Sequence, residues 1–138
     1  MTVHLSDAVR NAMLDAIETV GGTSVIFRLY SGPLPAGPAT AASGTLLAEI
    51  TLGSDWAAAA SGGSKSFSST PLQDATPNNN GTAGYWRLYK SDGTTCFAQG
   101  DVGVDGSGKS MILSSLTIST GVPFQILAWT LTAGNAGS

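Results

Sequence analysis

Residues 81–132 read GTAGYWRLYKSDGTTCFAQGDVGVDGSGKSMILSSLTISTGVPFQILAWTLT. Short runs with apolar residues at every second position alternate here with turns of Gly, Asp and Ser, the pattern of β-strands joined by tight connections. The same stretch contains, at residues 103–110, a complete match to G-x-x-x-x-G-K-[ST], the phosphate-binding loop of many nucleotide-binding enzymes. The two patterns predict different proteins: a β-domain without chemistry of its own, or an enzyme that binds nucleotides.

The residues that follow the motif decide between these interpretations. A phosphate-binding loop opens a helix, because the helix N-terminus attracts the anion. Residues 111–120, MILSSLTIST, are rich in β-branched and hydroxyl side chains and end at Gly121, so they predict a strand. The chain also lacks the alternation of strands and helices that builds the parallel sheet of such enzymes. We therefore interpret residues 103–110 as a hairpin turn that leaves Lys109 exposed.

The β-pattern extends over most of the chain. Strands are predicted at residues 24–30, 46–52, 65–69, 85–90, 95–102, 110–118 (with a break favoured near 114–115) and 123–132. Long loops are predicted at residues 31–44, which hold three prolines, and at residues 71–82, which are polar. Seven or eight strands at a spacing of about 8–12 residues, with no helices between them, predict a mainly β fold, a β-sandwich of jelly-roll type.

One helix precedes the strands. Ser6 is a good N-cap, Asp7 suits the first turn, and the glycines at positions 21 and 22 are typical of a helix end. We expect a helix at about residues 7–20 that covers an apolar surface, with a face formed by Val9, Met13, Ile17 and Val20. Residues 1–5 are then an N-terminal arm, residues 6–132 a single domain, and residues 133–138 a flexible tail.

Composition excludes several classes of function. Charged residues make up 11% of the 138 residues, against about 25% in ordinary soluble proteins, and the net charge is -3. The six Lys and Arg residues are dispersed, so we expect no nucleic acid partner. No apolar run approaches the roughly 18 residues that span a bilayer, and no secretory signal opens the sequence, so we expect a protein made in the cytoplasm with no membrane partner. The single cysteine, Cys96, excludes an intrachain disulfide framework.

Few residues have the spacing that chemistry requires. Asp101 and Asp105 lie among glycines but lack the pattern of a calcium-binding loop. His4 is the sole histidine, and no serine or cysteine arrangement points to it. The sequence leaves open a pair of carboxylates that only the fold would bring together. We predict that the protein is not an enzyme and has no catalytic residue, metal, cofactor or small-molecule substrate.

An aromatic stripe offers a candidate contact surface. Alternation places Tyr85, Arg87 and Tyr89 on one face of a strand and Trp86 and Leu88 on the other. Tyr and Arg are enriched at protein interfaces, so the first three are our candidate residues for contact with a partner. The alternative is that both faces are covered, inside a sandwich or by the helix.

Four segments together carry a resemblance to a known family. They are LSDAVRNAMLDAIE (5–18), VIFRLYSGPLPAGPATAASGTLLAEITL (25–52), GTAGYWRLYKSDG (81–93) and GVPFQILAWTLT (121–132). In combination they resemble the jelly-roll cementing, or decoration, proteins of tailed bacteriophages, over nearly the whole chain. The resemblance implies a structural protein of the virion that binds the outside of the capsid and bridges neighbouring major capsid protein subunits. We expect it to act as a homo-oligomer.

A second hypothesis comes from a different class of function. A phage tail carries modules that bind carbohydrates or receptors, and such modules stack exposed aromatic rings on sugars. The rings available for this would be Trp56, Tyr85, Tyr89 and Trp129.

Overall fold

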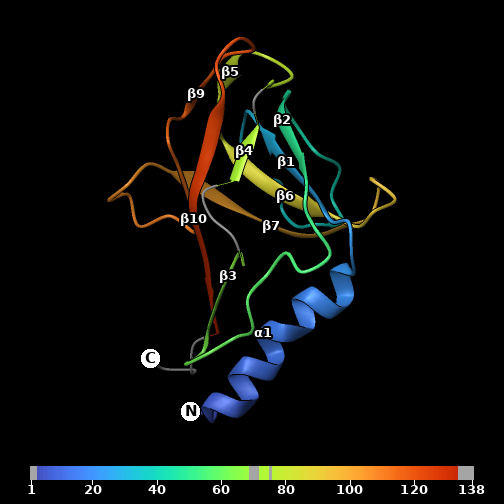
Figure 1. Ribbon diagram of the computed structural model, residues 1–138, viewed down its shortest axis with the longest axis vertical. Coiled ribbons are helices and arrows are strands. Elements are labelled where there is room, and N and C mark those ends of the chain that lie inside the picture. Colours follow the sequence, from blue (N-terminus) through green and yellow to red (C-terminus); the bar gives the residue numbers. More distant parts are fainter. Residues whose placement is uncertain (1–2, 69–71, 75, 134–138) are drawn as a thin grey trace.

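A computed structural model describes residues 3–68, 72–74 and 76–133 of the chain (Figure 1). One helix, α1 (Asp7–Gly21), precedes all the strands. The strands are β1 (Ile26–Tyr30), β2 (Leu46–Thr51), β3 (Ser64–Ser66), β4 (Leu72–Asp74), β5 (Gly81–Thr82), β6 (Tyr85–Tyr89), β7 (Cys96–Gly103), β8 (Met111–Leu113), β9 (Thr117–Ile118) and β10 (Phe124–Thr132). The predicted break near residues 114–115 is confirmed, because β8 ends before it and β9 begins after it.

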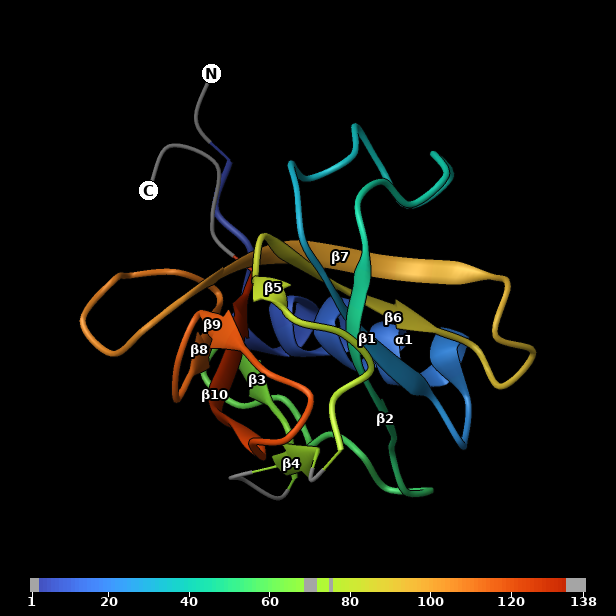
Figure 2. The same ribbon diagram turned by 90° about the horizontal axis from the view of Figure 1, so that it is seen from above.

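Most of the strands belong to one curled sheet. β2, β1, β6 and β7 pair antiparallel in that order, and β7 then pairs with β8 in parallel. β8 pairs antiparallel with β10, which also pairs with β3 and β4, while β5 and β9 form a small separate sheet. Seen from above in Figure 2, β7 runs past both the β1–β6 half and the β8–β10 half of the sheet. The prediction of a mainly β, jelly-roll-like sandwich with one N-terminal helix is confirmed.

Aromatic rings fill the space between the two halves of the sheet. Trp86 on β6 meets Trp129 on β10 edge to face, with ring centroids 5.9 Å apart. Phe67 stacks on Trp129 at 4.6 Å, and Trp56 lies 6.3 Å from the same ring. Trp56 Nε1 also donates a hydrogen bond of 3.0 Å to the carbonyl of Gly22, just after α1. This aromatic cluster therefore joins both halves of the sheet and the end of the helix.

Helix α1 begins and ends close to the predicted residues. The Ser6 hydroxyl accepts a hydrogen bond of 3.3 Å from the backbone N–H of Val9, which satisfies one of the free donors at the helix start. Gly22, with a φ of 75°, ends the helix, and its backbone N–H donates a hydrogen bond of 2.9 Å to the carbonyl of Glu18. The local signals in the sequence are thus sufficient to place this element.

The face through which α1 packs differs from the prediction. Of the four residues expected to cover the sheet, only Ile17 packs partly against the core, whereas Val9, Met13 and Val20 are 45%, 54% and 54% exposed. The residue that α1 buries most deeply among the large apolar ones is Leu14. The prediction was wrong because two apolar stripes lie side by side on the helix, and spacing alone does not say which faces the sheet.

The segment predicted as a polar loop at residues 71–82 also differs from expectation, since it contains β4 and β5. Asp74 explains part of this: it is 9% exposed, and its carboxylate accepts hydrogen bonds from the backbone N–H groups of Glu49 (3.2 Å) and Thr76 (2.9 Å). β4 pairs with β10 and β5 pairs with β9, and this pairing supplies hydrogen-bond partners for the backbone of the segment. Of the predicted tail, residues 134–138 lie outside the described residues, and Ala133 accepts a bond of 2.6 Å from Arg10 Nε.

We expect Trp129→Ala to lower the free energy of unfolding by about 3–5 kcal/mol, because it removes the central ring of the aromatic cluster and leaves a cavity. Urea denaturation followed by circular dichroism measures this change. The control is Val122→Ala, at a side chain that is 59% exposed, which should change the free energy by less than about 0.5 kcal/mol. Equal, small losses for the two variants would contradict the role assigned to Trp129.

Candidate functional site

The three candidate contact residues lie together but are buried. Tyr85, Arg87 and Tyr89 share one face of β6, as predicted, and Trp86 and Leu88 share the other. The exposed fractions of the three are 0%, 2% and 6%. Both faces of β6 are therefore covered, which is the alternative that the sequence left open. Contact between these side chains and a partner stays a prediction, and it requires the segment that covers them to move.

The covering segment is the proline-containing loop at residues 31–44, and hydrogen bonds fix it in place. The Tyr85 hydroxyl donates to the carbonyl of Ser43 at 2.6 Å and accepts from the N–H of Ser43 at 2.9 Å. Arg87 Nη2 donates to the carbonyl of Thr40 at 2.6 Å. A buried guanidinium needs acceptors, and here the backbone of the loop supplies them.

A row of polar side chains crosses four paired strands of the sheet. Arg28 on β1 lies opposite Arg87 on β6, which places two like charges in register. Arg28 Nε donates to Glu49 on β2 at 2.7 Å, and Arg87 Nε donates to Gln99 on β7 at 3.1 Å. Burial opposes the charge of Arg87, but the Tyr89 hydroxyl and neighbouring groups outweigh burial and raise the pKa of the guanidinium. Arg87 is therefore a permanent buried cation.

Tyrosine rings complete this layer. Tyr30 stacks on Tyr85 with centroids 5.2 Å apart, and its hydroxyl lies 3.4 Å from that of Tyr89. Burial, followed by the hydrogen bond with Tyr89, raises the pKa of Tyr30 to about 12. Trp56 and Trp129, the other proposed stacking platforms, are 4% and 1% exposed. The rings that the carbohydrate-binding hypothesis would use are thus packed inside the protein.

The motif at residues 103–110 connects two strands, as predicted, although it is not a hairpin. β7 ends at Gly103 and β8 begins at Met111, so a strand stands where a phosphate-binding loop would open a helix. The two strands pair in parallel, with Met111 beside Val102, so the loop returns the chain to the level of Val102 and β8 then runs in the same direction as β7. Lys109, in this loop, has a half-exposed side chain whose Nζ lies 3.7 Å from Asp101 Oδ2.

Ser110 is the residue of the motif with the most defined contacts. Its hydroxyl donates to Asp101 Oδ1 at 2.9 Å and accepts from Trp86 Nε1 at 3.1 Å. Its backbone N–H donates to the same carboxylate at 3.0 Å and is the main cause that lowers the pKa of Asp101. Ser110 thus fastens the loop to the aromatic cluster, which is a structural use of a residue that would bind a metal ion in a nucleotide-binding loop.

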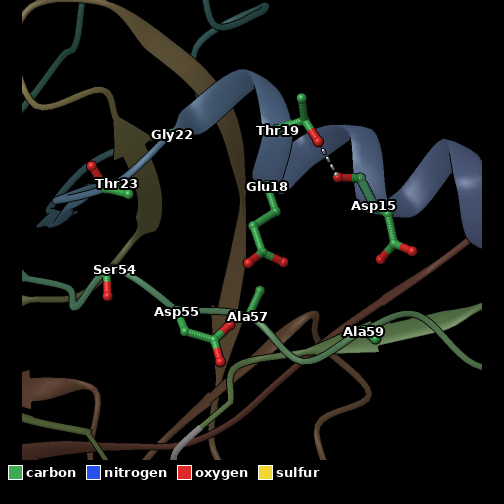
Figure 3. Close-up of a pocket in the computed structure, with 9 residues that line it drawn as sticks. All are labelled: Asp15, Glu18, Thr19, Gly22, Thr23, Ser54, Asp55, Ala57 and Ala59. Atoms are coloured by element: carbon green, nitrogen blue, oxygen red, sulfur yellow. Dashed lines mark hydrogen bonds between the residues drawn. The ribbon is translucent and has the colours of Figure 1, made fainter.

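A pocket of about 460 Å³ lies between α1 and the segment that follows β2 (Figure 3). Three carboxylates line it: Asp15 and Glu18 from α1, and Asp55 from the facing segment. Figure 3 shows Glu18 reaching from the helix towards that segment. This is the arrangement of acidic groups that the sequence left open.

A buried lysine already neutralises two of these acids. Lys65 has a side chain that is 0% exposed, and its Nζ donates to Asp15 at 2.8 Å, to Glu18 at 3.0 Å and to the carbonyl of Ala58 at 2.8 Å. Burial disfavours its charge, but the two carboxylates outweigh burial and raise the pKa of Lys65. The hydrogen bond from Lys65, followed by that from the N–H of Ala60, lowers the pKa of Asp15. The arrangement ties α1 to β3, with no free carboxyl pair left at Asp15 and Glu18.

Lys65 was not predicted as a site residue, although the sequence holds a signal for it. In the stretch Ser64–Ser66 and on to Phe67, Lys65 alternates with serines and shares the inward face with Phe67. Among the described residues, no three His, Cys, Asp or Glu side chains gather as a metal site would require. In the same part of the chain, no helix has the length and apolar character needed to cross a bilayer.

Comparisons of the chain with protein-family models, with curated proteins and with solved structures found no match. The contacts of the site form two closed polar clusters, one around Arg87 and one around Lys65, and each holds a covering element against the sheet.

We expect Ser110→Ala to destabilise the protein by about 1–3 kcal/mol, because the indole N–H of Trp86, which is 1% exposed, loses its acceptor away from bulk water. Lys109→Ala should change the free energy of unfolding by less than about 0.5 kcal/mol, since its contact is exposed. Thermal and urea unfolding of the two variants test this order. ATP titration by calorimetry is the check on function: ATP affinity that Lys109→Ala abolishes would overturn the structural interpretation of the loop.

We expect the double variant Asp15→Asn/Glu18→Gln to unfold at a lower temperature than Lys65→Met. The double variant leaves a buried ammonium without carboxylate partners, whereas Lys65→Met replaces it with an apolar side chain of similar length. Adding Lys65→Met to the double variant should recover part of the lost melting temperature. Equal melting temperatures for all three proteins would contradict the tether between α1 and β3.

The same cluster predicts a dependence of stability on pH. The pKa of Asp15 is lower in the folded than in the unfolded state, so its stabilising contribution is present above about pH 4 and is lost as the pH falls through the folded pKa. The pKa of Lys65 is raised, so its contribution is lost only at alkaline pH, as the pH rises through the folded pKa. Acidification should therefore destabilise the wild type more than Lys65→Met, in melting curves recorded from pH 7 down to pH 3.

Proposed function

We propose that this protein is a structural component of a tailed-bacteriophage virion that binds the outside of the capsid and bridges neighbouring major capsid subunits. The observation that carries the proposal is the resemblance of residues 5–18, 25–52, 81–93 and 121–132 to phage cementing proteins. The predicted jelly-roll-like fold with an N-terminal helix agrees with that resemblance. The action is non-covalent and needs no cofactor or substrate.

A rigid fold supports this role. A protein that bridges subunits transmits load through its own structure, so its long connections must be held in place. The loop at residues 31–44 is held by Tyr85 and Arg87, and the loop at residues 103–110 is held by Ser110. The protein therefore offers fixed surfaces to a partner, which lowers the entropy lost on binding.

The character of the surface supports it as well. The described residues include eight large apolar side chains that are 40% exposed or more: Val3, Val9, Met13, Val20, Leu34, Val104, Val122 and Leu127. Only 11% of the chain is charged. Such a surface suits contact with another neutral protein surface, and weak contacts repeated over a capsid lattice become strong through multivalency.

The burial of the aromatic rings disfavours the alternative function, carbohydrate binding. A stacking platform presents an aromatic face to the ligand, whereas Trp56, Tyr85, Tyr89 and Trp129 are all less than 7% exposed. The acidic pocket offers no competing chemistry at Asp15 and Glu18, because Lys65 occupies both.

Quantification of this protein in virions of the phage that encodes it tests the proposal. We expect hundreds of copies per particle, in a fixed ratio to the major capsid protein, by quantitative mass spectrometry of purified particles. Particles that lack the protein should lose their DNA at a lower temperature than complete particles, and addition of the purified protein should restore the difference.

Three results would contradict the proposal. A few copies per virion would indicate a tail or vertex location instead of a capsid lattice. Particles without the protein that are as stable as complete ones would exclude a cementing role. Because the surface carries little charge, release of the protein from capsids by salt alone would also contradict the kind of contact proposed.

A further inference from the structure

Helix α1 turns an apolar stripe towards solvent. Val9, Met13 and Val20 are 45%, 54% and 54% exposed, and Ala16 between them is also exposed. Their spacing of four, three and four residues places all of them on one line along the helix. Figure 1 shows α1 along the edge of the molecule, with the rest of the chain on one side of it. The stripe is the longest apolar feature that α1 leaves uncovered among the described residues.

Specific polar contacts fix the rotation that exposes this stripe. On the side of α1 that faces the protein, the Asn11 side chain accepts from the N–H of Gly63 at 2.9 Å, and Asp15 accepts from the N–H of Ala60 at 2.9 Å. The ion pairs with Lys65 lie on the same side. Turning the helix to bury the stripe would break these bonds. The helix therefore packs through Leu14, Ile17 and these polar contacts, and keeps its second apolar stripe free.

The stripe is symmetric in its own spacing. A two-fold axis through the middle of the helix, between Leu14 and Asp15, would place Val9 opposite Val20 of a second copy and Met13 opposite its Ala16. A large side chain then meets a small one at the centre, and two β-branched side chains meet at each end. The antiparallel arrangement also places the positive end of one helix dipole beside the negative end of the other. No side chain of the stripe carries a charge that a second copy would have to pair.

We propose that this stripe is the interface of a two-fold symmetric homodimer, in which α1 of one copy packs antiparallel against α1 of another. Interfaces of this kind use the same surface patch on both subunits, so a self-complementary pattern is the feature they require. The inference rests on exposure and spacing in α1 and does not depend on the proposed function.

The size of the stripe sets the expected strength. From Val9 to Val20 it runs about 17 Å along the helix. One helix face is smaller than the roughly 1,200–2,000 Å² buried in stable, specific complexes. We therefore expect a weak dimer whose population rises with protein concentration and which a capsid lattice would reinforce.

Two single substitutions test the interface without harm to the fold. Val9→Glu completes a capping box with Ser6, and Val20→Lys places a cation in the last turn, so each one favours the helix itself. Each also places a charge against an apolar side chain of the second copy. Sedimentation velocity over a range of concentrations should show a dissociation constant of the dimer raised at least about tenfold by either one. Circular dichroism and melting temperature should remain those of the wild type.

The double variant Val9→Glu/Val20→Lys tests the antiparallel register. In the proposed dimer each Glu faces the Lys of the other copy, so dimerisation should recover at least in part. Within one helix the two positions are about 17 Å apart, too far to pair with each other. In a parallel pairing like charges would face one another, and the double variant would dimerise no better than the single ones.

Val122→Glu is the matched control, because Val122 is 59% exposed and lies in the β9–β10 connection, at the opposite end of the molecule from α1 in Figure 1. It should leave the dimer unchanged. A wild-type protein that stays monomeric at the highest concentrations, or a dimer that survives both single substitutions, would overturn the proposal. Loss of the dimer in the single variants without recovery in the double variant would overturn the antiparallel register.

Discussion

Packing of aromatic rings around Trp129 is the interaction on which the rest of this structure depends. A curled sheet encloses a core only if its two halves are held face to face, and here β6 and β10 supply the rings that meet across the space. Trp129 touches three other rings, and its indole nitrogen is the buried side-chain polar atom that has no hydrogen-bond partner within the described residues. The gain from close packing must exceed the cost of that unpaired N–H. Trp56 extends the same cluster to the end of α1.

Buried cations organise the elements that surround this core. The chain has six Lys and Arg residues, and four of them have side chains that are mostly buried: Arg10, Arg28, Lys65 and Arg87. Each of the two deepest fixes one covering element, because a buried charge must find acceptors. Arg87 donates hydrogen bonds to the backbone of the loop at residues 31–44 and so holds the loop over the outer face of β6. Lys65 donates to the carboxylates of α1 and so holds the helix against β3. Most of the basic side chains of this protein thus serve internal structure, and few of them are left at the surface.

The distance along the chain over which a contact acts decides what the sequence could predict and what it could not. The helix ends follow from Ser6 and Gly22, and the strands follow from alternation, because these signals are local. The burial of Tyr85 and Arg87 depends on a loop more than forty residues earlier in the chain, and no local pattern indicates that contact. The strands in the polar segment at residues 71–82 likewise form because β10 and β9 offer partners. The parallel pairing of β7 with β8 is a third case, since turn residues at Gly106 and Gly108 suit a hairpin equally well.

The orientation of α1 shows that apolar periodicity misleads where polar contacts are strong. Periodicity identified an apolar face through Val9, Met13 and Val20, and ordinary burial energetics would place that face on the sheet. Leaving these three side chains about half exposed costs a few kcal/mol in total, because full burial of one of them is worth about 1.5–3 kcal/mol. The ion pairs of Lys65 with Asp15 and Glu18 oppose it, because turning the helix would leave a buried ammonium without carboxylates, a change of comparable or larger cost. A charge inside the protein therefore determines which apolar surface lies outside it, and an exposed surface maintained in this way is available for a second protein to cover.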